Sequence, residues 1–185
     1  MIIYTLYIPN MVVSFEMITD VNELNEVALT VYHIKPMNLP TLQEKIKEIG
    51  KDLAELSICG DYLDELIIPD GVWFVQCARL GLKKLVVPDS VRWLYCNDNF
   101  LEELEVPNTI EYLVAHDNIL HTLRFRGGNP TKLGILELYH NRFTRFDFEI
   151  PECCESVMIN HNYPIEFMSE SIRNAINMSD DPYIP

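Results

Sequence analysis

The chain has 185 residues, 48% of them hydrophobic, and its formal net charge is −14 with a pI near 4.6. The hydrophobic fraction excludes a disordered acidic tail, and the acidity is opposite to the basic footprint that phosphate binding requires. The sequence contains no run of about 18 uncharged apolar residues, the length that a membrane span needs. We therefore expect one domain or one solenoid that binds neither nucleic acid nor membrane.

The cysteines and the N-terminal residues indicate the compartment. Five cysteines occur without paired spacing, which favours a reducing environment. Residues 1–17 are apolar, but they lack a basic start and are interrupted by Pro9-Asn10, so they make a poor signal peptide. We expect a cytoplasmic protein.

Residues 1–52 are predicted to form an N-terminal cap. Runs rich in β-branched and aromatic residues at Ile2–Ile8 and Met11–Met17 flank a Pro-Asn turn, which predicts a hairpin, and Val27–Ile34 is a third candidate strand. Residues 41–50 carry a capping box at their start and a glycine at their end, which predicts a short helix. A repeat array needs its first core layer covered, so an end unit of different sequence is expected there.

Residues 53–162 repeat with a fixed period. Leu82, Leu101 and Leu120 are 19 residues apart, and the same interval separates prolines, strand leucines and asparagines of neighbouring units. Upstream the period reaches Leu53, and downstream it continues after four inserted residues at 126–129 and a later insertion of two. Self-similarity of this kind indicates stacked units, and the chain carries about six copies of the strand.

Three segments of the array share one strand motif: Leu94-x-Cys96-x-x-Asn99-x-Leu101, Leu113-x-Ala115-x-x-Asn118-x-Leu120 and Leu136-x-Leu138-x-x-Asn141-x-Phe143. The motif resembles the leucine-rich repeat family. The return segments Leu85–Pro88 and Leu104–Pro107 are similar to its shortest classes, those of bacterial effectors and the proline-containing repeats of amoebae and their giant viruses. The resemblance covers about residues 53–162 and implies a solenoid and a habit of binding proteins.

The length of the unit limits the return side of each turn. A unit of 19 residues is shorter than the usual repeat of about 20–29 residues, which leaves no room for a convex helix. The expected fold class is therefore α/β or mostly β: a leucine-rich-repeat solenoid with short parallel strands, an extended convex side and distinct caps at both ends.

Residues 163–185 lose the period and are predicted to form a C-terminal cap. The segment Ser169–Met178 begins with Ser-Glu and carries Ile172, Ala175 and Ile176 at helical spacing. This pattern predicts a short amphipathic helix that covers the end of the array.

Alternation along each strand predicts the side chains that line the concave sheet. With Leu94 and Cys96 directed inward, Trp93, Tyr95 and Asn97 face outward. Carried through the units, this register gives three exposed columns: Glu55, Phe74, Trp93, Tyr112, Ile135 and Ser156; Ser57, Gln76, Tyr95, Val114, Glu137 and Met158; and Cys59, Ala78, Asn97, His116, Tyr139 and Asn160.

The middle of this concave surface is predicted to bind a protein partner. A contiguous apolar patch with a polar rim marks an interaction site, and Tyr and Trp are enriched in interface cores. The alternative is that a cap or the insertion covers the patch as ordinary core. The candidate partner-binding residues are Phe74, Trp93, Tyr95, Tyr112, Val114, His116, Ile135, Glu137 and Tyr139.

The recurring asparagines are interpreted as structural. Where each strand turns outward, main-chain groups lose their sheet partners, and an inward amide can satisfy groups of its own unit and of the next. This predicted asparagine ladder consists of Asn99, Asn118, Asn141 and Asn162.

Two other sets of residues have reactive side chains. Cys77 and Cys96 share an inward column and are interpreted as small hydrophobic residues, and Cys154 occupies a core position. Cys153 and Cys59 are expected to be exposed.

A polar residue precedes each asparagine of the ladder: Asp98, Asp117, His140 and His161. These residues form either a solvated rim of turn-forming residues or a column that binds a metal or exchanges protons. We expect no metal, no cofactor and no catalytic residue, because phosphate loops, serine elbows and paired-cysteine motifs are absent from the sequence.

Two functions are consistent with the sequence. The first is a non-catalytic module that binds a protein partner through the concave face. The second is a structural subunit of a larger assembly, such as a giant-virus particle, which would place the chain in the host cytoplasm or the virion. An enzyme is not expected, and self-association is left open.

Overall fold

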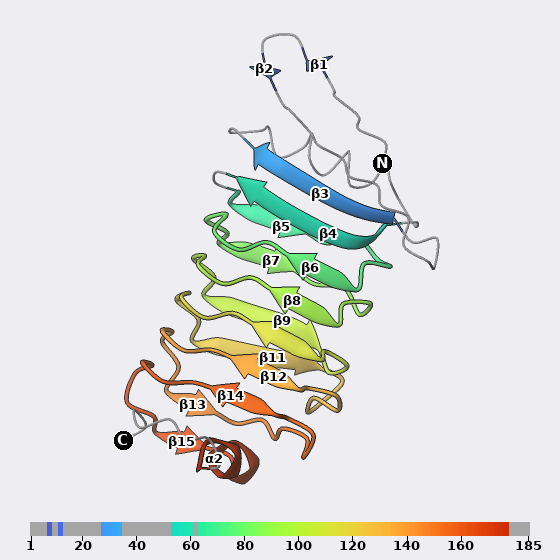
Figure 1. Cartoon of the computed structure of the whole chain (residues 1–185). Coiled ribbons are helices and arrows are strands. Elements are labelled where there is room, and N and C mark those ends of the chain that lie inside the picture. Colours follow the sequence, from blue (N-terminus) through green and yellow to red (C-terminus); the bar gives the residue numbers. More distant parts are fainter. Residues whose placement is uncertain (1–6, 9–10, 13–26, 35–52, 61–62, 178–185) are drawn as a thin grey trace.

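The computed structural model describes residues 7–8, 11–12, 27–34, 53–60 and 63–177. The chain winds as a parallel β-solenoid whose successive turns each add one strand to a seven-stranded sheet (Figure 1). We call it the concave sheet, after the face that the sequence predicted. All neighbouring strands in this sheet run parallel. In spatial order the strands are β3 (Val27–Ile34), β4 (Leu53–Gly60), β6 (Phe74–Gln76), β8 (Trp93–Tyr95), β10 (Tyr112–Val114), β12 (Ile135–Glu137) and β14 (Ser156–Met158).

The return side of the turns is extended, as the short repeat predicted. Its strands form three separate parallel pairs. The pairs are β5 (Glu65–Ile67) with β7 (Lys84–Val86), β9 (Glu103–Pro107) with β11 (Thr122–Arg126), and β13 (Arg145–Phe146) with β15 (Phe167–Met168). The fold is therefore mostly β, with parallel strands in both layers.

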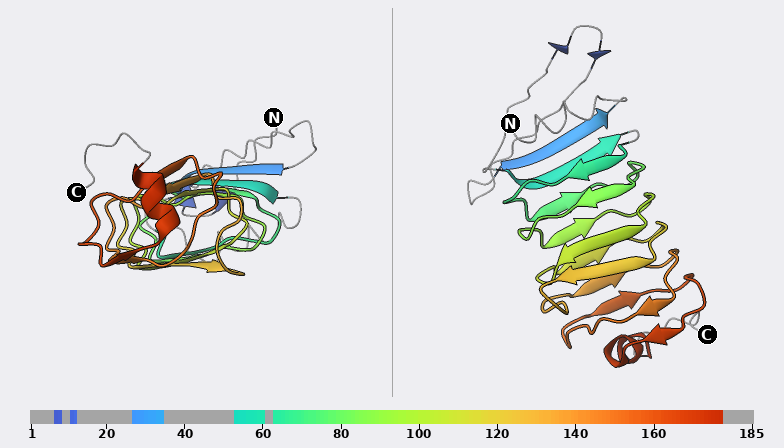
Figure 2. Two further views of the ribbon diagram at one scale, coloured as in Figure 1. Left: turned by 90° about the horizontal axis from the view of Figure 1, so that it is seen from below. Right: turned by 180° about the vertical axis from the view of Figure 1, so that it is seen from behind.

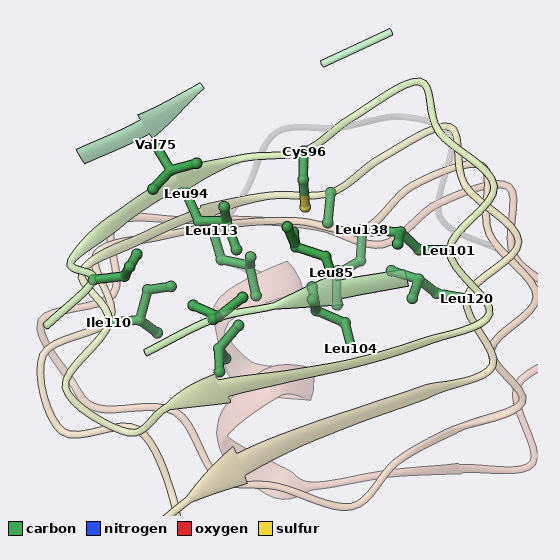
Figure 3. Packing of buried hydrophobic residues seen from close by; sticks show 14 of the residues in the cluster. Val75, Leu85, Leu94, Cys96, Leu101, Leu104, Ile110, Leu113, Leu120 and Leu138 are labelled. Carbon is green, nitrogen blue, oxygen red and sulfur yellow. The ribbon is translucent and has the colours of Figure 1, made fainter. Parts of the chain in front are cut away.

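The core lies between the concave sheet and the return layer. Figure 3 shows that Leu94 and Leu113 of the concave strands and Leu104 of the return layer point into the same space. Their exposed fractions are between 0% and 2%, so these three leucines are completely buried. Burial of a leucine contributes about 1.5–3 kcal/mol, and the 19-residue period repeats this gain in successive turns.

The concave strands β6, β8, β10, β12 and β14 are each followed by a corner residue with a left-handed backbone. The φ angles at this position lie between 51° and 61°. Asp and His adopt this conformation more readily than most residues other than Gly and Asn. The corner residues are Arg79, Asp98, Asp117, His140 and His161. The conformation gives a structural reason for the residue types in this column.

The concave sheet extends to the N-terminal side of the 19-residue units. β1 (Tyr7–Ile8) and β2 (Met11–Val12) pair antiparallel. The strand predicted at Val27–Ile34 is present as β3, and it pairs in parallel with β4, so the concave sheet begins before the first 19-residue unit. The helix predicted over residues 41–50 lies outside the described residues.

A helix lies across the C-terminal end of the solenoid. α2 (Glu170–Asn177) begins one residue after Ser169 and lies at the C-terminal end of the stacked turns (Figure 2). Its residues Ile172 and Ile176 are buried, with exposed fractions of 0% and 3%. The carboxylate of Glu149 accepts hydrogen bonds from the main-chain N–H and the hydroxyl of Ser171 in the first turn. The preceding turn of the solenoid thus caps the N-terminus of the helix, where an anion is favoured. Among the described residues, no helix has the length and apolar character needed to cross a bilayer.

Candidate functional site

The concave strands pair in the register that the sequence predicted. Trp93 is the partner of Phe74 on one side and of Tyr112 on the other, and Tyr95 is the partner of Gln76 and Val114. The third column follows from main-chain hydrogen bonds beyond the strands, for example from the N–H of Asp98 to the C=O of His116 at 3.1 Å. The three predicted columns therefore lie side by side on one face of the sheet.

Five rings form a continuous contact network on the first turns of this surface, which we call the aromatic ladder. Trp93 is central, with ring centroids 5.7 Å from Trp73, 6.2 Å from Phe74 and 4.7 Å from Tyr112. The ring of Tyr95 lies 5.8 Å from that of Phe74. Tilted and edge-to-face pairs at these separations each contribute about 0.5–1.5 kcal/mol beyond their burial. The aromatic ladder is a preformed surface with little side-chain freedom left to lose.

Trp73 belongs to the aromatic ladder, although it is not among the residues of the three predicted columns. It precedes β6, and its main-chain N–H donates to the C=O of Ala54 at 2.8 Å, so it lies just outside the paired strand. The alternation rule covers only strand residues and therefore missed it. The available signal was its position directly before Phe74, where two large aromatic residues are adjacent in the sequence.

The predicted partner-binding residues differ in how much of them solvent can reach. Phe74, Trp93, Tyr95 and Tyr112 are half-buried. Val114 is only 8% exposed, so little of its side chain is open to a partner. Its neighbours across the sheet, Tyr95 and Glu137, carry longer side chains, which cover a residue as short as valine. The half-buried group also includes His116, Ile135, Glu137 and Tyr139.

A second cluster lies beyond the aromatic ladder, around Asp117. The His116 ring stacks on the Tyr139 ring at 4.3 Å with an interplanar angle of 8°. The Nδ1 atoms of His116 and His140 lie 2.7 Å and 3.0 Å from the two carboxylate oxygens of Asp117. Partial burial raises the pKa of Asp117, but the hydrogen bonds with His116 and His140 outweigh this effect, and the net pKa is lowered. Asp117 therefore holds both imidazole rings in place.

Acidic side chains act on the tyrosines of this surface. Burial raises the pKa of the Tyr139 hydroxyl, and the charges of Glu137, Asp117 and Asp98 raise it further. The pKa of Tyr95 is raised for similar reasons, by burial, by Tyr112 and by Glu137. At one end of the aromatic ladder the indole N–H of Trp93 donates to the carboxylate of Glu111 at 3.3 Å. Acidic groups thus border the aromatic ladder at both ends of the strands.

The asparagine ladder is made of inward amides that bond to main-chain groups of adjacent turns. The side-chain oxygen of Asn118 accepts from the N–H of Leu101, and its amide donates to the C=O groups of Cys96, Ala115 and His116, all at 3.0–3.2 Å. Asn99, Asn141 and Asn162 bond in the same way. These bonds join the concave corners of neighbouring turns.

The corner column and the cysteines offer little reactive chemistry. Within the described part of the chain, no three His, Cys, Asp or Glu side chains are grouped to hold a metal ion. Burial raises the pKa of the Cys77 thiol to about 12 and that of Cys96 well above its usual value, so both are protonated at neutral pH. Cys154 is half-buried, with its pKa raised by burial to about 11, and Cys153 is exposed. The side chain of Cys59 lies outside the described residues.

No family model, no curated protein and no solved structure matches this chain. The functional interpretation therefore depends on the geometry and charge of the concave surface.

Proposed function

We propose that this solenoid is a non-catalytic protein-binding module that holds a partner against the aromatic ladder of its concave face. The observation that carries the proposal is the contact network around Trp93, whose ring touches three neighbours while remaining half-buried. Tyr and Trp held in this way dominate binding energy in protein interfaces, because burying them costs little conformational entropy.

The surrounding charges favour a partner that presents basic side chains. Glu111, Glu137, Asp98 and Asp117 border the aromatic ladder and the Tyr139 cluster, in a chain with a net charge of −14. Lysine or arginine heads of a partner gain both from these carboxylates and from the faces of the rings. Binding should therefore weaken as salt concentration rises.

We further propose that the repeats are a short, proline-containing class of leucine-rich repeat. The pattern of inward leucines with an asparagine at each corner supports this assignment, since the asparagines bond to main-chain groups of the adjacent turns. A relation to giant-virus proteins and a location in the cytoplasm or a virion belong to the same proposal, motivated by the proline position and by the unpaired cysteine spacing.

A structural subunit is the second candidate function. Ile67 and Val86 are direct partners in the β5–β7 pair and are 45% and 41% exposed on the return layer. Neighbouring exposed aliphatic side chains suit lateral packing in an assembly. This candidate predicts fixed stoichiometry in a particle or self-association of the purified chain, which light scattering coupled to size-exclusion chromatography measures.

The partner-binding proposal is tested by affinity capture from the native source with mass spectrometry. The double variant Trp93→Ala/Tyr95→Ala should reduce capture of a specific partner by about tenfold or more, the effect of losing an interface hot spot. Tyr163→Ala, which removes an aromatic ring 51% exposed outside the concave columns, is the matched control and should capture normally.

A second variant separates lost binding from lost folding. Gln76 is exposed in the second column beside Tyr95, so Gln76→Arg adds bulk to the concave surface without removing a packed ring. We expect it to block capture while the thermal unfolding midpoint stays that of the unmodified chain. Equal capture by the unmodified chain, the double variant and Gln76→Arg would exclude the concave surface as the binding site.

A further inference from the structure

The four carboxylates that border the concave surface differ in whether a hydrogen-bond donor reaches them. Glu111 accepts from an indole N–H at 3.3 Å, and Asp98 accepts from an asparagine amide at 2.6 Å. Asp117 accepts from two imidazole rings. Glu137, in the second concave column, accepts no hydrogen bond from any residue that the structure describes.

The neighbours of Glu137 explain why its carboxylate has no donor. Across the sheet Glu137 pairs with Val114 on one side and Met158 on the other, and neither side chain carries an N–H or O–H group. Only 25% of the Glu137 side chain is exposed, so solvent reaches it from one side only. A largely buried charge without a partner costs free energy, which marks this carboxylate as a group that a ligand completes.

The ring of His116 presents a second acceptor to the same space. The lowered pKa of Asp117 keeps its carboxylate ionised at neutral pH, and an ionised carboxylate only accepts hydrogen bonds. The Nδ1 atom of His116, 2.7 Å from this carboxylate, therefore carries the proton of that bond. The Nε2 atom of the neutral ring is then an acceptor, and it lies 4.0 Å from Oε2 of Glu137. Two acceptors thus face each other without a donor between them.

Aromatic rings surround these two acceptors. The His116 ring stacks on the Tyr139 ring at 4.3 Å, and the His116 side chain is 16% exposed, so its orientation is fixed. The charge of Glu137 contributes to the raised pKa of both Tyr139 and Tyr95, which lie on either side of it on the concave surface. Rings next to a carboxylate favour a cation, because the faces of the rings add to the attraction.

The separation of the acceptors selects the group that fits between them. A nitrogen about 2.8 Å from each of two acceptors that are 4.0 Å apart forms its two hydrogen bonds at an angle of roughly 90°. An ammonium group can form such a pair, since it carries three donors on one atom. A guanidinium spreads five donors over a plane, which is more than two acceptors satisfy. A neutral donor would leave the charge of Glu137 unpaired.

We propose that Glu137 and His116 together bind the ammonium group of a lysine side chain that the protein partner presents to the concave surface. One N–H of the ammonium donates to Nε2 of His116 and another to Oε2 of Glu137, while the methylene chain of the lysine lies against the aromatic ladder. This inference rests on the proposed function, and it makes Glu137 the residue that selects a partner with a lysine at this point of the interface.

A peptide probe tests the site without a known partner. The test uses the full-length chain at about pH 8, above the ordinary pKa of imidazole, and the tripeptide Leu-Lys-Leu, acetylated and amidated. We expect a Kd of about 0.1–1 mM and a change in the ¹⁵N chemical shift of His116 Nε2 as this atom accepts a hydrogen bond. A peptide with norleucine in place of lysine should bind at least about tenfold more weakly because it has no donor, and one with arginine about threefold more weakly. Equal binding of the norleucine peptide, tighter binding of the arginine peptide, or no binding of the lysine peptide at about 10 mM would overturn the proposal.

Substitution of Glu137 separates a binding role from a structural one. Glu137→Gln keeps the shape of the side chain and removes its charge, so it should weaken binding of the lysine peptide by about tenfold or more. Its thermal unfolding midpoint should equal or exceed that of the unmodified chain, because an unpaired charge is removed. A lowered midpoint would show that the carboxylate serves the fold and would contradict the proposal. Glu102→Gln, which removes an exposed carboxylate outside the concave columns, is the matched control and should bind the peptide normally.

The same variant distinguishes failure of this inference from failure of the proposed function. In affinity capture from the native source, Glu137→Gln should lose the partner, as Trp93→Ala/Tyr95→Ala does. If only the double variant loses the partner, the concave surface binds without a lysine at Glu137, and this inference alone is wrong. If neither variant loses the partner, the proposed function is wrong, and the lysine-binding role that rests on it is wrong as well.

Discussion

The two layers of the solenoid are built from the same 19-residue units, but only one of them is continuous. The concave sheet runs through seven strands, whereas the return layer divides into three pairs. The asparagine ladder lies at the concave corners, where each amide bonds to main-chain groups of the adjacent turn. The return layer contains no comparable column, so an insertion of four residues at 126–129 is absorbed there. The asparagine bonds between turns thus lie along the layer that stays continuous.

The largest contrast is expected between two leucines of the same turn. Leu113 on the concave side is 0% exposed, whereas Leu123 on the return side is half-buried. Leu113→Ala should cost about 2–5 kcal/mol of unfolding free energy, because a fully enclosed cavity remains. Leu123→Ala should cost roughly half as much or less, since less apolar area is lost. Chemical denaturation of both variants measures the difference, and equal costs would show that the return layer is as tightly packed as the concave one.

A smaller contrast is expected between two asparagines. Asn118→Ala removes an amide that is 7% exposed: the N–H of Leu101 loses its acceptor, and the C=O groups of Cys96, Ala115 and His116 each lose one donor, at a cost of about 1–3 kcal/mol. Asn108 on the return side donates an exposed bond to the C=O of Gly127 at 3.1 Å, and Asn108→Ala should cost no more than about 0.5–1 kcal/mol. If the two variants unfold at the same denaturant concentration, the asparagine ladder does not hold the concave corners together.

Lowering the pH should remove the stabilising contribution of Asp117, the corner residue after β10. The pKa of Asp117 in the folded protein is lowered from the usual 3.8, through hydrogen bonds with His116 and His140 that outweigh partial burial. Its stabilising effect is therefore complete above about pH 4 and is lost as pH falls through the lower folded value. Asp117→Asn, which tolerates the left-handed corner, should show a shallower loss of unfolding free energy below this pH. Asp98→Asn is the matched control and should retain the slope of the unmodified chain.

The smallest effect is expected at the corner residue least suited to its conformation. Arg79 has a φ of 61°, where the Cβ of an arginine is unfavourable and asparagine is tolerated. Arg79→Asn should stabilise the protein by roughly 0.5 kcal/mol, after loss of the exposed Arg79–Asp98 pair at 3.4 Å is counted. A raised thermal midpoint checks this. A lowered midpoint would mean that the ion pair outweighs the backbone conformation.

The sequence predicted the regular part of this fold well, for a physical reason. Strands of three residues alternate strictly, and a constant period carries the register of Leu94 to Leu113 without adjustment. Features outside that regularity were missed. β3 pairs with β4 through Leu29 and Leu56, whose numbers differ by 27 rather than 19. The 19-residue period therefore does not predict this pairing. Trp73 lies beyond the paired strand, where alternation makes no prediction.

Other features depend on the sizes of neighbours rather than on pattern. Val114 lies in the predicted column, but the longer side chains of Tyr95 and Glu137 bury it. The left-handed corners explain why Asp and His recur before the asparagines. Asp and His are also common metal ligands, so the residue types alone could not distinguish a corner from a metal site.

Site-specific photo-crosslinking tests the central claim, that a partner binds on the concave face, most directly. A benzophenone side chain is placed at Gln76 in the second concave column, and separately at Val86, which is 41% exposed on the return layer. Irradiation in the native lysate should join a specific protein to the chain from position 76 and not from position 86. Crosslinking from position 86 alone, or equally from both positions, would contradict the concave-face account and favour a structural subunit that packs through its return layer.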